Sequence, residues 1–251
     1  MIDALYDKLG IPESCHLGKR VFKKLFHENT KLGATDKRAF REDIDTIIWQ
    51  YTLKTSTIPI QEYEDEQREY QEVAVLQVDS RTQNRTNRIA EIIHRSIPYP
   101  LIIIFSFRNM CALSLAHKRF SQAEKGAIVA EDFITTDWID LSAPTPVQKA
   151  FLASLALADL SHTHFFAFYS ALADRLVALD CSRLTGEYRI KGTAVRREQR
   201  RYRLSRCHEL ELQIAEQRAS IKAETQFNRK VELNTKIKAL EKKLLDKSTG
   251  L

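Results

Sequence analysis

Hydrophobic and polar positions alternate most clearly between residues 47 and 54. Ile47, Trp49, Tyr51 and Leu53 form one bulky apolar face, so this segment is predicted to be a half-buried strand. Residues 72–78 and 101–107 are apolar on both faces, and the second run predicts a central strand. Residues 111–119 follow a short turn and are expected to pair antiparallel with it. The pattern predicts a mostly antiparallel four-stranded sheet.

Helical spacing predicts the elements around this sheet. Residues 85–97 place isoleucines on one face and mostly charged residues on the other. From Thr145 the sequence predicts two helices rich in alanine and leucine, and a further helix from Thr193 almost to the end. We therefore expect an α+β body over residues 1–192, with helices covering the sheet, and a basic helical arm over residues 193–251.

The arm carries apolar residues at coiled-coil-like spacing. The seam residues are Leu210, Ile214, Ile221, Leu233, Ile237, Leu240 and Leu244. The first three and the last four follow different registers, so residues 222–232 predict either a stutter in one long helix or the turn of a hairpin. Such a seam buries its stripe against a partner helix or within the same chain. The arm is predicted to serve protein association, including oligomer formation.

Positive charge is concentrated in the arm. The whole chain has a net charge of +6, whereas residues 193–251 hold 15 Lys and Arg against 8 Asp and Glu, a net of +7. The first 192 residues are therefore left with a net charge of −1. A nearly neutral body with a basic arm is the asymmetry expected of a protein that meets a polyanion or an acidic partner.

Composition places the chain among globular proteins, with 43% hydrophobic and 29% charged residues. No apolar run approaches the roughly 18 residues that a membrane helix needs, and the opening residues lack the apolar core of a secretory signal. The four cysteines occur singly, without metal-binding or redox spacing. We expect a cytoplasmic protein without contact to a membrane.

The sequence lacks the glycine-rich motifs that hold nucleotide phosphates. Its seven glycines are dispersed and form no phosphate loop, dinucleotide fingerprint or nucleophile elbow. His162 and His164 lie two residues apart without other ligand residues at metal-binding spacing, and His117 beside Lys118 is interpreted as a satisfied or surface histidine at a strand end. We therefore expect no metal and no cofactor.

A metal-dependent nuclease is the alternative that the order of elements favours. A helix, two strands, a helix and a strand resemble the order of restriction-nuclease-like cores, and the candidate carboxylates are Asp43, Glu72 and Asp79. Such a site needs a carboxylate followed by an acid-x-Lys sequence to hold Mg²⁺ and orient water. The second strand instead ends Gln77-Val78-Asp79, without the leading acid or the lysine. A nuclease site here would be degenerate.

An arginine cluster opens the arm. Between residues 195 and 206 the chain carries Arg196, Arg197, Arg200, Arg201, Arg203 and Arg206 but one acid, with Tyr202 among them. On a helix these side chains spread around most of the circumference, and guanidinium groups suit phosphate oxygens. The cluster predicts contact with the DNA or RNA backbone. An acidic protein surface and a solvated helix start without a partner are the alternatives.

Six segments together resemble a bacterial domain family of unknown function, encoded beside helicases and DNA methyltransferases in restriction-like and phage-defence clusters. The matching segments are residues 19–29, 34–54, 64–78, 93–105, 113–119 and 226–244, which span nearly the whole chain. The resemblance implies a genomic context, beside helicases and methyltransferases, and implies no particular activity. Members of that family often have a glutamate in the second strand where this chain has Gln77.

These observations predict a non-catalytic accessory subunit of a bacterial DNA-acting system. The arginines would hold a nucleic-acid backbone, and the seam would dock a helicase or methyltransferase. A restriction-type nuclease with a degenerate site is the alternative function.

Overall fold

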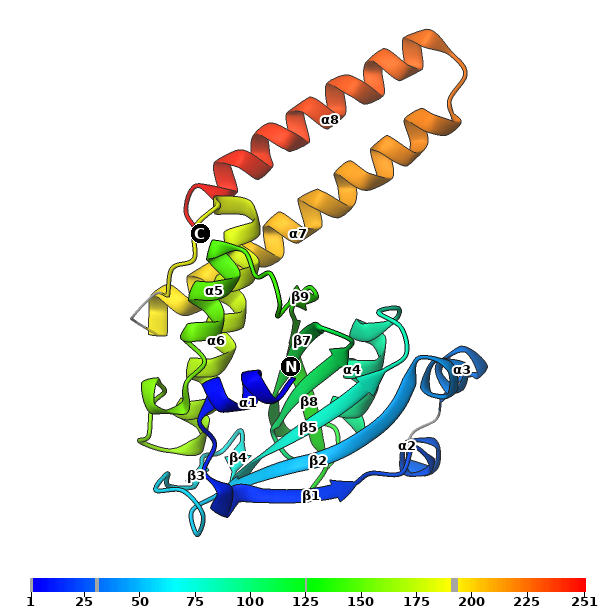
Figure 1. Cartoon of the computed structure of the whole chain (residues 1–251). Coiled ribbons are helices and arrows are strands. Elements are labelled where there is room, and N and C mark those ends of the chain that lie inside the picture. Colours follow the sequence, from blue (N-terminus) through cyan, green and yellow to red (C-terminus); the bar gives the residue numbers. More distant parts are fainter. Residues whose placement is uncertain (1, 30–31, 125, 191–193) are drawn as a thin grey trace. The chain divides into compact units, whose positions relative to one another are not determined.

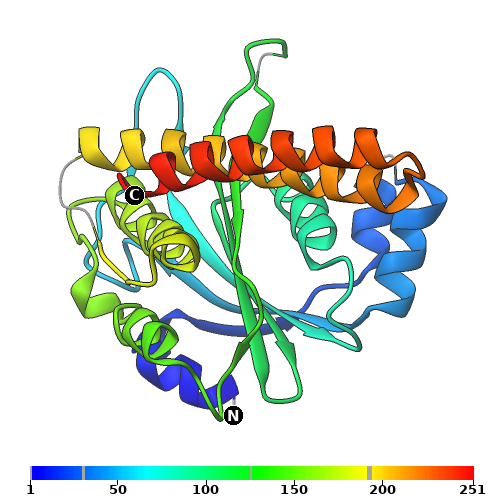
Figure 2. The same cartoon turned by 90° about the horizontal axis from the view of Figure 1, so that it is seen from above.

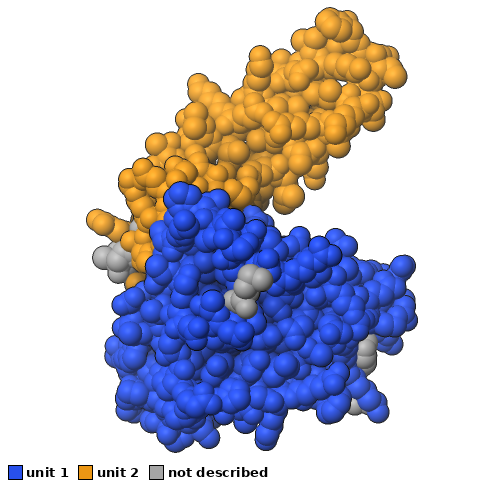
Figure 3. All heavy atoms as spheres, viewed as in Figure 1, with its two compact units in different colours: residues 1–176 blue, residues 177–251 orange. Residues whose placement is uncertain are grey.

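The computed structural model describes residues 2–29, 32–124, 126–190 and 194–251. The chain forms two compact units, residues 1–176 and residues 177–251, which are coloured separately in Figure 3. The division between them falls within one long helix, α6 (Phe165–Thr185). The predicted domain boundary between residues 192 and 193 lies outside the described residues.

A mixed sheet organises the first unit (Figure 1). Its main path runs β1-β2-β5-β6-β7-β8, and β9 pairs with β7. The strands are β1 (His16–Arg20), β2 (Ile44–Lys54), β5 (Glu72–Ser80), β6 (Leu101–Phe107), β7 (Met110–Phe120), β8 (Ile128–Thr135) and β9 (Ile139–Asp140). β5 and β6 are parallel, and the other pairs are antiparallel. The prediction of a mostly antiparallel sheet is confirmed, but the sheet has seven strands and not four.

The strands that the sequence pattern missed lie mainly at the edges of the sheet. All five residues of β1 are exposed, so β1 shows no apolar alternation. β8 is half-buried and carries the adjacent acids Glu131 and Asp132. An edge strand lacks a neighbour on one side, and its side chains need not follow the core pattern. A further short pair, β3 (Tyr63–Glu64) with β4 (Glu69–Tyr70), forms within the acidic stretch of residues 62–72.

The helices of the first unit are α1 (Ile2–Leu9), α2 (Lys24–Asn29), α3 (Ala34–Glu42), α4 (Thr86–Ser96) and α5 (Pro146–Ala153), with 3₁₀ turns at Glu13–Cys15 and Leu157–Asp159. The helix predicted over residues 85–97 and the two predicted from Thr145 form as α4, α5 and α6. α4 is the crossover between the parallel strands β5 and β6. α5 begins at a capping box, in which Thr145 and Gln148 satisfy each other's backbone N–H groups.

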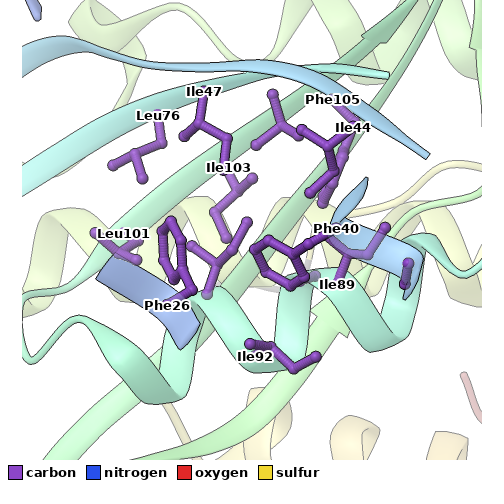
Figure 4. Packing of buried hydrophobic residues seen from close by; sticks show 14 of the residues in the cluster. Phe26, Phe40, Ile44, Ile47, Leu76, Ile89, Ile92, Leu101, Ile103 and Phe105 are labelled. Carbon is purple, nitrogen blue, oxygen red and sulfur yellow. The ribbon is translucent and has the colours of Figure 1, made fainter. Parts of the chain in front are cut away.

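The main hydrophobic cluster lies between α3, α4 and one face of the sheet (Figure 4). Phe40 from α3 and Ile89 from α4 point toward Ile47, Leu76 and Ile103 of three adjacent strands. Each of these side chains is at least 98% buried. Burying such aliphatic and aromatic groups is the main favourable contribution to folding, so this cluster fixes the position of the strand ends that carry the polar residues discussed below.

The second unit contains a helical hairpin. α7 (Ala194–Ala223) and α8 (Phe227–Ser248) run antiparallel and lie side by side in Figures 1 and 2. The turn between them is held by Glu224, whose side chain accepts the N–H groups of Thr225 and Gln226, both at 2.8 Å. These two hydrogen bonds lower the pKa of Glu224. The choice that the sequence left open is thus resolved in favour of a hairpin.

Candidate functional sites

The arginine cluster occupies the first turns of α7. Arg196, Arg203 and Arg206 are exposed, Arg197 and Arg201 are partly buried, and Arg200 is 4% exposed. Tyr202, which lies within the cluster, is 68% exposed. The helix therefore presents guanidinium groups and an aromatic ring together at its surface, a combination that suits a phosphate backbone with accessible bases.

Two exposed arginines of this cluster have contacts of different charge. Arg206 forms an ion pair with Glu209 one turn later. Arg203 donates to the carbonyl oxygen of Gly250 at 2.9 Å, and this neutral acceptor leaves the guanidinium charge in place. Residues 194–206 contain six arginines and a single acid, Glu198. The segment thus carries a surplus of positive charge that an anion would neutralise.

The predicted seam lies between α7 and α8. Ile214 and Ile237 are buried, at 5% and 6% exposure, and Leu210, Ile221, Leu233, Leu240 and Leu244 are half-buried. Arg218 of α7 pairs with Glu241 of α8 at 2.7 Å. Two helices alone cover each other's apolar stripe incompletely, and the five half-buried residues reflect this.

Two grooves follow the hairpin. One of about 460 Å³ is lined by Ile214 and Leu244, with Glu211, Arg218, Lys222 and Glu241 around them. Another of about 610 Å³ is lined by Leu233, with Glu224, Arg229, Glu232 and Lys236. Each groove therefore combines an apolar floor with two acids and two bases. A third helix of mixed charge fits these surfaces better than a polyanion does.

The candidate nuclease carboxylates do not meet in one place. Asp43, 2% exposed, ends α3 and accepts from Arg85 Nε at 2.5 Å and from Thr82 at 3.0 Å. Glu72 stands opposite Lys54 at the beginning of β5, and its burial raises its pKa. Asp79 lies seven residues further along the same strand, roughly 23 Å away at the usual rise per residue. Among the described residues, no group of three or more potential metal ligands comes together.

Asp79 is instead the centre of a polar network at the carboxyl end of β5. It accepts from Thr46 at 2.5 Å, Ser106 at 2.6 Å and Gln77 at 2.7 Å, and Gln50 donates to Gln77 at 3.0 Å. Three donors therefore occupy both carboxylate oxygens of Asp79. Thr46 precedes the alternating segment of β2, and strand register brings it opposite Asp79, so no local sequence pattern indicated this network.

Tyr6 of α1 lies near this network. Its hydroxyl is buried and has no hydrogen-bond partner among the described residues. Burial, followed by the charges of Tyr51 and Asp79, raises the pKa of Tyr6. The Tyr6 hydroxyl therefore stays protonated in the folded chain.

His117 and Lys118 are buried in β7 and do not join the carboxylates. His117 Nδ1 lies 2.9 Å from the Tyr70 hydroxyl, which agrees with the satisfied histidine predicted as one of two possibilities. Lys118 Nζ donates to the carbonyl oxygens of His94 and Ile97, the latter at 2.6 Å, at the C-terminal end of α4. Burial lowers the pKa of Lys118 to about 7. This lysine therefore caps a helix, where the open carbonyls favour a donor.

The histidines at the start of α6 also bond to the backbone. His162 Nε2 lies 2.9 Å from the carbonyl oxygen of Leu157, and His164 Nδ1 accepts from the N–H of Ala167 at 3.1 Å. The second contact places His164 at the helix start, where a side-chain acceptor satisfies an open N–H group.

Together these features define a mixed α+β protein with a helical hairpin whose first helix carries a cationic surface. None of the helices in the described residues has the length and apolar character required to cross a bilayer. The chain belongs to the protein family described as Domain of unknown function (DUF4391), whose profile matches residues 9–244. The expected resemblance to a family of unknown function is confirmed at that level. No curated protein and no solved structure matches the chain.

Proposed function

We propose that this protein is a non-catalytic accessory subunit of a bacterial DNA-acting system, of the restriction-like or anti-phage kind. In this proposal the arginines of α7 hold the backbone of DNA or RNA, and the seam between α7 and α8 docks a helicase or methyltransferase. The association with a DNA-acting system is inferred from the resemblance of the six segments described above. The nucleic-acid and protein contacts are inferred from the charged and apolar side chains of the second unit.

The surplus of arginine at the start of α7 is the observation that carries the proposal. Arg203 donates a hydrogen bond to the neutral carbonyl oxygen of Gly250, and Glu198 is the single acid among residues 194–206. A phosphate backbone would bring negative charge to this arginine-rich segment, and each phosphate contact would release counterions. Tyr202, exposed at 68%, would be accessible for stacking on a base.

The seam supports docking of a helical partner. Leu210, Leu240 and Leu244 are half-buried within the hairpin, and the grooves beside them mix acids and bases. A partner helix with complementary charges would complete the burial of the seam. We assign the nucleic acid and the protein partner to different parts of the hairpin because their surfaces differ in charge.

The test compares two triple variants that remove equal charge from exposed positions. Arg196, Arg203 and Arg206 are changed to Gln in one variant, and Lys238, Lys242 and Lys243 in the matched control on α8. Binding of a labelled duplex or single-stranded RNA of about 20 nucleotides is measured over a range of salt. The arginine variant is expected to lose roughly tenfold in affinity, and the slope of log K against log salt to fall by about 3. Equal losses in both variants, or none, would refute the α7 interface.

A metal-dependent restriction-type nuclease is the second candidate, and one observation favours it. Asp79 and Ser106 are in register at the carboxyl ends of the parallel strands β5 and β6, where open α/β sheets bind ligands. Plasmid cleavage with Mg²⁺ by the chain and its reconstituted complex tests this candidate. Cleavage that disappears in Asp79→Ala would establish it, whereas intact plasmid in every reaction would retire it.

A further inference from the structure

The exposed edge of the sheet at β1 combines three features that point to a ligand. β1 ends the strand order and pairs with β2 alone among the described strands. The edge therefore offers backbone N–H and C=O groups on its outer side. An apolar groove of about 290 Å³ opens beside it. The polar rim of the groove is basic.

The apolar lining comes from β1, α2, β2 and the end of α4. Its side chains are Leu17, Val21, Leu25, Phe26, Trp49 and Ile97. Leu17 is 39% exposed and Leu25 is 47% exposed, and neighbouring Phe22 is 64% exposed. Apolar side chains gathered at a strand edge in this way mark an interaction surface more often than isolated exposed residues do.

The charged groups that line the groove are both cations. Lys19 and Arg20 of β1 contribute to the lining, and no acid does so among the described residues. Strand register supports the placement of Lys19, which pairs with the groove-lining Trp49 of β2. A ligand for this groove must therefore combine a bulky apolar group with negative charge.

The bulge in β1 shapes the edge further. Gly18 has a φ of 61°, and the register between β1 and β2 shifts between His16 and Lys19. A β-bulge of this kind re-aims the side chains that follow it. Here those side chains are Lys19, Arg20 and Val21, which line the groove.

We propose that β1 and its groove bind an extended acidic segment of another protein by strand addition. The segment would pair with the free edge of β1 through its backbone and insert one leucine or phenylalanine into the groove. Its glutamates or aspartates would face Lys19 and Arg20. Main-chain hydrogen bonds supply affinity in this mode, and side-chain pockets supply selectivity. The site lies within the first unit and does not depend on the nucleic-acid interface of α7.

Labelled ten-residue peptides test the proposal by fluorescence anisotropy with the full-length chain. The first alternates glutamate with leucine and phenylalanine, the second replaces every glutamate with lysine, and the third carries N-methyl groups along one backbone edge. The acidic peptide is expected to bind, and the other two to bind at least roughly tenfold more weakly. Equal binding of the acidic and N-methylated peptides would overturn strand addition.

Two variants of the groove and one matched control locate the binding. Leu25→Asp, and Lys19→Glu combined with Arg20→Glu, are each expected to weaken the acidic peptide by at least roughly tenfold. Leu245→Asp, at a 68% exposed position on α8, should leave it unchanged. Slower amide exchange of residues 17–21 with the peptide bound is a readout that needs no variant. Absence of binding by the unaltered chain would mean that the charges and bulge of β1 serve to protect the edge.

Discussion

The two units of this molecule use arginine in opposite ways. In the first unit Arg88 donates two hydrogen bonds to the Asp36 carboxylate, at 2.9 and 2.7 Å. Arg85 Nε donates to the carboxylate of the buried Asp43 at 2.5 Å. In the second unit six arginines follow one another along α7 with Glu198 as the single acid of their segment. The arginines of the first unit join α4 to α3, whereas those at the start of α7 outnumber the acids of their own segment. Similar side chains thus stabilise the packing of helices in one unit and give a net positive segment in the other.

Pairing with arginine changes the pKa of a carboxyl group in the first unit. The hydrogen bond from Arg88 lowers the pKa of Asp36. In the second unit Arg183 pairs with Glu211 at 2.7 Å, so the base of the hairpin is also held by internal ion pairs. The excess of arginine over acids is therefore confined to the first turns of α7.

The largest expected effect concerns Lys118, the buried cation of the first unit that bonds to helix carbonyls. Its pKa is about 7 in the folded chain and that of an ordinary lysine when unfolded. The unfolded chain therefore binds more protons between these values, and the free energy of unfolding rises with pH across this window. Between pH 7 and 9 we expect the unaltered chain to gain about 2 kcal/mol relative to Lys118→Met. Urea unfolding at several pH values measures this difference.

Tryptophan fluorescence reports the unfolding of the first unit, because Trp49 and Trp138 both lie within residues 1–176. Cysteine and tyrosine ionisation affects both chains alike and cancels in the comparison. A parallel pH dependence in Lys118→Met would show that the lysine does not change its protonation on folding.

A smaller effect is expected from removing one carboxylate in each unit. Asp43→Ala removes the acceptor of Thr82 and the nearer acceptor of Arg85, which keeps Glu42 at 3.5 Å. We expect a loss of about 1.5 kcal/mol in the free energy of unfolding. Glu209→Ala removes the partner of Arg206 from an exposed pair and should cost about 0.5 kcal/mol or less. Urea unfolding followed by fluorescence for the first unit and by circular dichroism for the hairpin gives both values. Similar losses in the two variants would contradict the contrast between the units.

Much of the fold follows from local patterning. The alternation of β2, the continuous apolar run of β6 and the isoleucine face of α4 were each sufficient to place an element within a few residues. These segments are the ones buried against the main hydrophobic cluster, so burial imposes a period on their sequence. β1 is fully exposed and lacks such a period, which is why its place in the sheet could not be predicted.

The candidate sites differ in how much of each the sequence reveals. The arginine cluster of α7 could be located from the sequence because its members lie close together in a segment predicted to be helical. The network around Asp79 draws Thr46 and Ser106 from β2 and β6, and the β1 groove draws Ile97 from the end of α4. Strand register and helix placement bring these residues together, and neither is encoded in the spacing of any single segment.

The sequence by itself determined the main buried strands and helices, the charge asymmetry and the cationic start of α7, because each depends on neighbours along the chain. The tertiary structure alone decided that Thr46 and Ser106 meet Asp79, that Lys118 caps α4, and that the arm folds back as a hairpin. These outcomes depend on which surfaces pack against each other, and packing is a property of the whole chain.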